Sequence, residues 1–113
     1  MLDYRIATAA QCDLEELVAY TAERFGELAL DRYLRLLDVA IGNLRMDPQC
    51  VGVRVFSETL RSYHLSVCKE QARNMTGVVK NPRHLIFFRL GQDGVLEIVR
   101  LLHDSMDFER HLP

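Results

Sequence analysis

The feature that most constrains this chain is a pair of helical patterns that follow each other almost without a break. Apolar side chains recur at helical spacing from Leu14 to Phe25, and they recur again from Leu30 to Leu44. Gly26 lies between the two patterns and is a typical helix stop, while Asp47-Pro48 ends the second one. Each helix has a single apolar stripe, so both need a flat surface against which to bury it. We therefore predict an antiparallel helical hairpin packed on a sheet.

The rest of the chain predicts the strands of that sheet. A short strand at Tyr4–Ala7 leads into the first helix, where Thr8-x-x-Gln11 matches a capping box. Three further strand-prone runs cover residues 60–67, 83–90 and 95–103. Glycines between the last two runs predict a hairpin there. The expected order is β-α-α-β-β-β, an α+β fold in which the helical hairpin packs on a small antiparallel sheet.

Two segments show no regular pattern. Residues 49–59 are expected to be a plain connector, and residues 68–82 are long for a connection between strands. Such long loops often carry function. Between these segments, the alternation along residues 60–67 places Tyr63, Leu65 and Val67 on one face of a half-buried strand.

Arg100 stands out in the most apolar strand-prone run, which we expect to be a central strand covered by the helices on one side. A buried guanidinium needs a partner. Glu97 falls on the opposite face of an ideal strand, so the partner must be a carboxylate from another strand or a group in the C-terminal tail.

Length and composition indicate one globular domain over residues 1–113, with 49% hydrophobic and 27% charged residues. No apolar run approaches the roughly 18–20 residues of a membrane span, and the N-terminus has no signal-peptide pattern, so we expect a cytoplasmic protein without membrane contact. Three cysteines fit neither a disulfide framework nor a paired metal site. His103 and Asp107 lie four residues apart, but the histidines are scattered, so we expect no metal and no cofactor.

The formal charge of −2 hides an uneven distribution of charged residues. Residues 61–89 contain six basic side chains and a single acidic one, Glu70. This basic zone is suited either to a polyanion or to an acidic protein segment. Ordinary solvated side chains are the alternative explanation.

Most familiar catalytic patterns are missing from the sequence. It contains no P-loop, dinucleotide-binding glycine motif, nucleophile elbow or zincin motif. A metal-free ribonuclease remains open because it needs only a base, an acid and cations for the phosphate. Its candidate residues are Arg61, Arg83, His84 and His103.

The last strand and the tail carry the most specific pattern of the chain. Ile98, Arg100, Leu102, His103, Met106 and Asp107 form the arrangement I-x-R-x-L-H-x-x-M-D. In the N-terminal half the matching residues are Asp13, Leu14, Leu17, Tyr20, Thr21, Phe25, Gly26, Ala29, Tyr33 and Pro48. Through these residues the chain resembles the ParE toxins of the RelE/ParE superfamily over nearly its whole length. The segment 68–82 is longer than the connection expected in that family.

The resemblance implies a toxin of a type II toxin–antitoxin system that a cognate antitoxin neutralises. ParE toxins are associated with stalling of DNA gyrase on cleaved DNA, whereas RelE toxins cut mRNA on the ribosome. The resemblance favours gyrase as the target, with the ribosome-dependent endoribonuclease as the alternative. It also implies a hetero-oligomer with the antitoxin, and sequence-specific DNA binding only through that complex.

Two sets of contact residues are expected on this interpretation. Target contacts are expected from Arg61, Arg83, Arg89, His103, Met106 and Asp107. Antitoxin contacts are expected from Leu30, Tyr33, Leu34, Leu37, Arg73 and Lys80. The helical hairpin offers a groove in which a partner helix or an added strand can bind.

Overall fold

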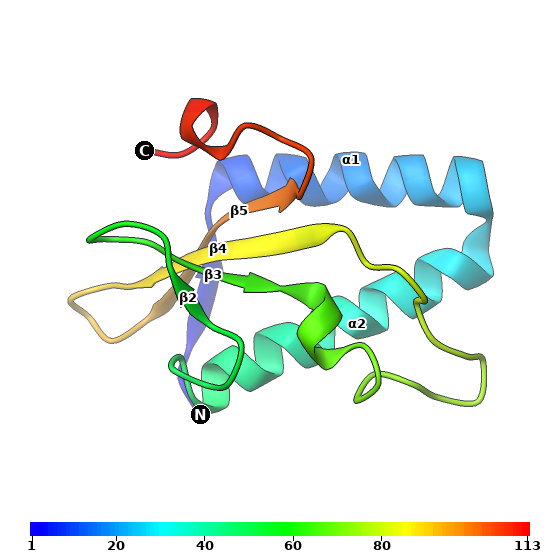
Figure 1. Cartoon of the computed structure of the whole chain (residues 1–113), viewed down its shortest axis with the longest axis horizontal. Helices are drawn as coiled ribbons and strands as arrows, with labels where there is room; N and C mark the ends of the chain where they lie inside the picture. Colours follow the sequence, from blue (N-terminus) through cyan, green and yellow to red (C-terminus); the bar gives the residue numbers. More distant parts are fainter.

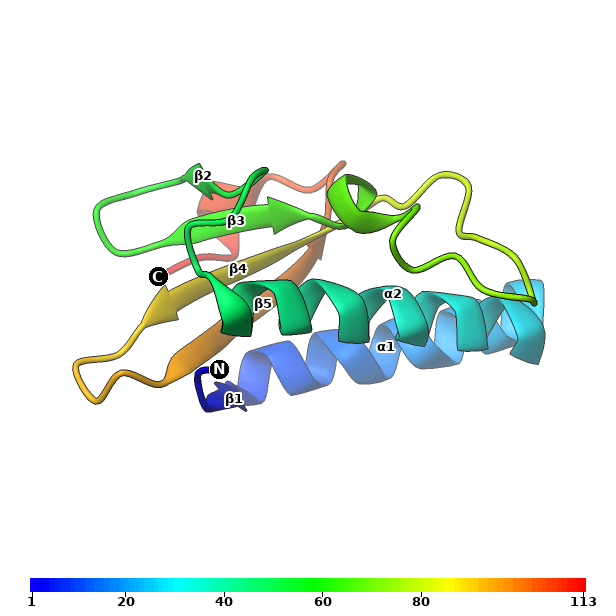
Figure 2. The same ribbon diagram turned by 90° about the horizontal axis from the view of Figure 1, so that it is seen from below.

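The computed structural model describes every residue from Met1 to Pro113 and builds a five-stranded sheet in the order β1-β5-β4-β3-β2 (Figure 1). The strands are β1 (Tyr4–Ile6), β2 (Arg54–Val55), β3 (Arg61–His64), β4 (His84–Leu90) and β5 (Leu96–His103). The helices are α1 (Thr8–Phe25) and α2 (Glu27–Met46), with short 3-10 helices η1 (Leu65–Cys68) and η2 (Phe108–Arg110). The two long helices lie side by side on one face of the sheet (Figure 2). The α+β fold class is confirmed.

The helical hairpin turns at Gly26, as the sequence predicts. The Gly26 amide still donates to the Ala22 carbonyl at 3.1 Å, but its φ of 88° takes the chain out of the helix. A residue with a side chain adopts such a positive φ only with strain, so glycine suits this position. The next helix starts at Glu27, and the two helices need no further linker.

The sheet is mixed, which differs from the antiparallel sheet expected. Strands β2 to β5 pair antiparallel, but β1 pairs parallel with β5, Tyr4 opposite Leu96. The hairpin returns the chain to the end where it began, and the Leu2 amide donates to the Arg45 carbonyl at 2.9 Å. Alternation of side chains determines their faces but not the neighbour or direction of a strand, so this pairing was not visible in the sequence.

The predicted capping box is wrong. Ala7, in an extended conformation, is the N-cap of α1, and no side chain caps the helix. Thr8 is already the first helical residue, so its hydroxyl lies past the cap position. Gln11 instead donates from Nε2 to the Ile6 carbonyl at 2.9 Å, which ties the first turn of the helix to β1.

The strand expected over residues 60–67 is shorter, and the connector before it is partly ordered. β3 ends at His64, whose Nδ1 accepts a hydrogen bond from the Ser66 amide and starts η1. The turn moves Val67 outward to 46% exposure, while Tyr63 and Leu65 stay buried. Within the connector, β2 pairs with β3, so residues 49–59 include a two-residue edge strand.

The main core lies between the helical hairpin and the sheet. Its residues include Leu36, Leu44, Ile86 and Phe88, all 1% exposed or less. The opposite face of the sheet is also covered, since Phe87 is fully buried and packs edge-on against Phe56 and Phe108 at centroid distances of 5.3 and 5.0 Å. The C-terminal segment thus lies on the side of the sheet away from the helices (Figure 2).

Candidate functional site

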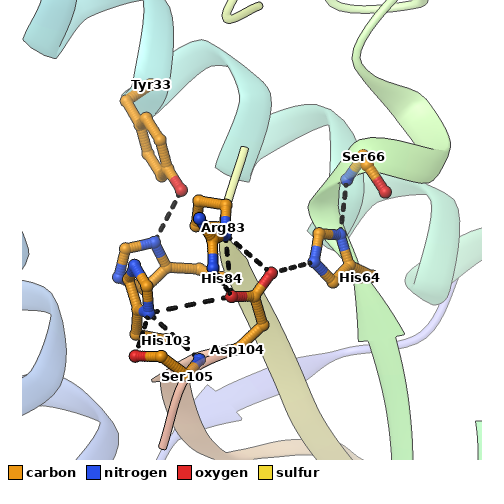
Figure 3. A network of polar contacts seen from close by, with 8 residues as sticks. All are labelled: Tyr33, His64, Ser66, Arg83, His84, His103, Asp104 and Ser105. Atoms are coloured by element: carbon orange, nitrogen blue, oxygen red, sulfur yellow. Dashed lines mark hydrogen bonds and ion pairs between the residues drawn. The ribbon is translucent and has the colours of Figure 1, made fainter. Parts of the chain in front are cut away.

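A polar network lies where β4 begins and β5 ends, beside the N-terminal half of α2. His84 of β4 and His103 of β5 are paired directly across the two strands. Tyr33 of α2 reaches the network from the helix layer, and Arg83, Asp104 and His64 join it from the ends of three strands (Figure 3). The strand register and the packing of α2 on the sheet therefore gather residues that are up to 71 positions apart (33 to 104) in the sequence.

Asp104 is the acidic centre of the network. Its carboxylate accepts hydrogen bonds from Arg83 Nε at 2.8 and 3.0 Å, and Arg83 Nη2 lies 2.7 Å from Oδ1. His64 Nε2 lies 3.1 Å from Oδ2. These bonds, first from Arg83 and then from His64, hold the pKa of Asp104 well below its usual range. The carboxylate stays ionised and occupies the Arg83 guanidinium.

His84 is held neutral against Tyr33. The Tyr33 hydroxyl lies 2.6 Å from His84 Nδ1. Burial raises the pKa of Tyr33 to about 12, so the phenol stays protonated and donates a hydrogen bond to His84 Nδ1. Burial, together with the neighbouring His103, lowers the pKa of His84 to about 4. The neutral ring therefore carries its proton on Nε2.

His103 is the more exposed member of the histidine pair. Its Nδ1 accepts from the Ser105 amide at 3.1 Å and lies 2.7 Å from the Ser105 hydroxyl. Its ring meets the His84 ring edge-on, with centroids 5.2 Å apart. Since Nδ1 is the acceptor, Nε2 carries the proton of the neutral ring and is free to face a ligand.

A groove of about 590 Å³ opens beside this network, between the tip of the helical hairpin and the segment that precedes β4. One wall is apolar and includes Tyr20, Phe25 and Ala29. The other groups lining it include Arg32, Lys80, Arg83, His84 and His103. None of the fourteen lining residues is acidic, although the chain as a whole has more acidic than basic side chains. The groove therefore favours a ligand that is partly apolar and negatively charged.

Residues 78–81 of the long segment 68–82 line the other side of the groove. Figure 1 shows the path of this segment between η1 and β4, and side chains of α2 hold it. Arg32 Nε donates to the Thr76 carbonyl at 2.7 Å, and Arg35 Nε donates to the Ala72 carbonyl at 2.9 Å. The Asn43 and Gln71 side-chain amides exchange two hydrogen bonds at 2.9 and 3.0 Å. This part of the chain is thus ordered by side chains of α2, which are far away in the sequence.

The residues proposed from the sequence for ribonuclease chemistry do not all meet. Arg83, His84 and His103 lie together, whereas Arg61 is opposite Phe88, four residues along β4 from His84. That separation is roughly 13 Å along the strand. Arg61 instead lines a smaller hollow of about 380 Å³ together with Arg89.

The other predicted contact residues differ in how far they are available to a partner. Arg89 is bound to Glu97 at 2.7 Å, and Arg73 is bound to Glu70 at 2.9 Å. Met106 and Asp107 are exposed in the C-terminal segment. Of the residues expected to contact the antitoxin, Tyr33 and Lys80 line the groove, Leu30 and Leu34 retain exposed surface, and Leu37 is buried in the core at 7% exposure.

Arg100 is paired with a carboxylate, as the sequence predicts, but the carboxylate belongs to a helix and not to another strand. Asp13 of α1 accepts from Arg100 Nε at 2.7 Å and from Nη2 at 2.8 Å. Asp13 Oδ2 also accepts from the Leu101 amide at 3.0 Å, where β1 no longer pairs with β5. Arg100 Nη1 in turn donates to the His111 carbonyl at 2.9 Å, so the predicted link to the tail is present.

Three contributors to the network were missed in the sequence. Asp104 and His64 carry no predicted role in the sequence, and Tyr33 is predicted only as an antitoxin contact. The alternation of residues 60–67 put His64 on a different face from Tyr63, but nothing local indicated that the start of β4 and the end of β5 would meet it.

No group of three or more potential metal ligands lies close together, and neither helix is long and apolar enough to cross a membrane.

Acidification should destabilise the fold through His84. The unfolded chain takes up this proton near pH 6.5, but the folded chain takes it up only near pH 4, so stability is lost as the pH falls between these values. This difference between the two pKa values corresponds to a loss of up to about 3 kcal/mol in the free energy of unfolding. Urea unfolding at pH 7.5 and pH 4.5 measures it. His84→Asn should show a clearly smaller loss, and an equal loss in both proteins would contradict the assignment.

The chain is similar in sequence to known proteins over nearly its whole length. Residues 4–108 match the model of a family described as the ParE toxin of the type II toxin–antitoxin system parDE. The chain is 32% identical over 109 residues to a protein named Toxin ParE1 from Mycobacterium tuberculosis strain H37Rv, covering 96% of each chain. It is 30% identical over 112 residues to Toxin ParE1 of Caulobacter vibrioides, covering 99% of each chain.

Proposed function

Since the chain belongs to the ParE toxin family of type II toxin–antitoxin systems, we propose that this toxin acts by binding DNA gyrase and blocking replication. The whole chain, residues 1–113, then serves as one toxin domain. Gyrase acts on DNA inside the cell, so the proposal requires a cytoplasmic protein. In this mode the toxin needs a recognition surface and no catalytic centre of its own.

One observation carries the proposal. Within the polar network Arg83 is already paired with Asp104, and His84 is buried and kept neutral. Arg83 is bound by Asp104 through three short contacts, and the buried His84 has a pKa of about 4. A phosphodiester-cleaving site needs a cation free to meet the phosphate and a base whose pKa lies near the working pH. Arg83 is not a free cation, and the pKa of His84 lies well below the working pH, so neither residue suits this chemistry. Both residues suit a rigid binding surface.

The C-terminal segment supports the same proposal. Met106 is 43% exposed and Asp107 is exposed beside it. Their turn is ordered by the Met106 amide, which donates to the His103 carbonyl at 3.0 Å, and by the packing of Phe108 on Phe87. A backbone that is already ordered loses little further conformational entropy on binding. Together with Arg83 and His103, this segment forms our proposed gyrase-binding surface.

The antitoxin is the second partner, because the family is that of toxins paired with antitoxins. We propose that it covers the groove and the exposed face of α2, through Leu30, Tyr33, Leu34 and Lys80. DNA recognition by the pair belongs to the antitoxin in this proposal. The toxin and antitoxin then form a hetero-oligomer.

A ribonuclease remains the second candidate because of one observation, the His84–His103 pair at the mouth of the groove. Two neighbouring imidazoles can act as base and acid in transesterification, where the 2′-oxygen attacks phosphorus, its proton goes to one ring, and the 5′-oxygen leaves with a proton from the other. The low pKa of His84 weakens this chemistry at neutral pH.

A gyrase assay decides between the two candidates. Purified toxin, gyrase and ATP should convert supercoiled plasmid into linear DNA that protease treatment reveals. Met106→Ala should require about tenfold more toxin for the same yield, since truncation of a central contact residue costs this order of affinity. Met46→Ala, at another exposed methionine, is the matched control.

Unchanged plasmid topology with folded toxin would overturn the gyrase proposal. New mRNA 5′ ends after induction, lost in His103→Ala, would then assign the ribonuclease function. Equal effects of the two methionine variants would remove the C-terminal segment from the gyrase-binding surface.

A further inference from the structure

The wall of the groove contains backbone groups without partners. Between Gly77 and Pro82 the chain has no regular secondary structure, and none of its residues 78–81 makes a backbone–backbone hydrogen bond. The Lys80 carbonyl alone is occupied, by Lys69 Nζ at 3.0 Å. Val78 and Val79 are half-buried and both line the groove.

These free groups restrict what can fill the groove. A partner that covers Val78 and Val79 removes water from their amides and carbonyls, and a buried backbone group without a hydrogen bond is costly. The backbone of a helix is satisfied internally and cannot supply the missing bonds. An extended segment can, because it offers its own free amides and carbonyls along one edge.

The charge of the groove further defines the occupant. Arg32, Lys80 and Arg83 line it and no carboxylate does. The Lys80 side chain is exposed, and no ion pair involves its ammonium group, which leaves it available to a partner. Arg83 is already paired with Asp104, so an acidic side chain near the valine contacts would meet the Lys80 ammonium and the Arg32 guanidinium. The apolar wall at Phe25 and Tyr20 suits an apolar neighbour.

We infer that the antitoxin places an extended, acidic segment in this groove and pairs it as an added strand with Val78 and Val79. The inference rests on the proposed toxin–antitoxin function and specifies how the antitoxin is held. The unusual length of segment 68–82 then has a role, since this segment provides a pairing edge separate from the five-stranded sheet. Its attachment to α2 through Arg32 and Arg35 keeps that edge in place before the partner arrives.

Amide hydrogen exchange followed by NMR tests the pairing on the unaltered protein. In the free toxin, the Val78 and Val79 amides should exchange fast because nothing accepts their protons. In the complex with purified cognate antitoxin, at least one of them should slow by about a hundredfold or more. Fast exchange of both amides in a saturated complex would overturn the inference. The same protection in concentrated toxin alone would assign the edge to a second copy and also overturn it.

Proline substitutions test the contribution of each amide to affinity. Val78→Pro or Val79→Pro should weaken antitoxin binding about tenfold, because proline removes the donor and leaves a partner carbonyl unpaired. Val51→Pro is the control. Val51 is 90% exposed, lies outside the groove and precedes Gly52 (φ 99°) in a turn closed by Val53 and Cys50, where proline fits well. Equal affinities for all three variants would contradict strand pairing.

A charge reversal tests the acidic character of the occupant. Lys80→Glu should weaken binding about tenfold at low salt and less at high salt. Arg54→Glu makes the same change of charge at the exposed edge strand β2 and should have little effect. Equal effects of both variants would show a nonspecific dependence on net charge. If the antitoxin fails to bind the unaltered toxin, the toxin–antitoxin function fails instead of the docking mode.

Discussion

Arg100→Ala should lower the free energy of unfolding by about 2–4 kcal/mol, since removing one member of a largely buried ion pair strands the other. The Arg100 and Asp13 side chains are only 20% and 11% exposed, and two hydrogen bonds join them. The substitution leaves the Asp13 carboxylate with the Leu101 amide alone. It also removes the donor that holds the His111 carbonyl, so the tail loses one of its attachments.

Urea unfolding of four proteins measures this contribution. The set is the parent, Arg100→Ala, Asp13→Ala and the double variant, whose combined loss should be smaller than the sum of the single losses. Arg83→Ala is the control for loss of an arginine, because Arg83 is exposed and its removal should leave the unfolding midpoint nearly unchanged. Equal midpoints for Arg100→Ala and Arg83→Ala would contradict the structural role of Arg100.

The helices could be predicted from the sequence because their signals are local. The apolar spacing in residues 8–25 and 27–46 repeats within each helix, and Gly26 marks the turn by its own conformational freedom. The β4–β5 hairpin was equally accessible, since its glycine-containing turn lies between its two strands. The parallel pairing of β1 and the early end of β3 at His64 depend on contacts between distant residues, which no local pattern encodes.

The candidate site was predictable in its residue types but not in its connections. The sequence singled out Arg83, His84 and His103, and the register of β4 and β5 brings them together. Whether Arg83 is a free cation depends on Asp104, twenty-one positions away, and the charge of His84 depends on burial against Tyr33. Burial and the choice of partner follow from tertiary packing, so the charge states of Arg83 and His84 could not be predicted from the sequence.

The second large effect is expected at Phe87, the centre of the core on the far side of the sheet. Phe87→Ala should lower the free energy of unfolding by about 3–5 kcal/mol, the usual loss for a large aromatic side chain removed from a packed interior. The sequence predicts helices over one face of the last strands only. Phe87 is fully buried because Phe56 and Phe108 cover the other face.

Comparing Phe87→Ala with Phe108→Ala separates two contributions to stability, the packing on the far face of the sheet and the attachment of the C-terminal tail. Phe108 is partly exposed and meets Phe87 edge-on, so Phe108→Ala should cost about 1–2 kcal/mol, and the double variant should cost about 1 kcal/mol less than the sum. Amides of residues 104–113 should exchange faster in both single variants, because each removes the aromatic contact that holds η2 on the sheet. Additive losses together with an unchanged tail would mean that Phe108 lies on Phe87 without stabilising it. The ordered C-terminal surface proposed for gyrase would then depend on its hydrogen bonds, from the Met106 amide to the His103 carbonyl and from Arg100 to the His111 carbonyl.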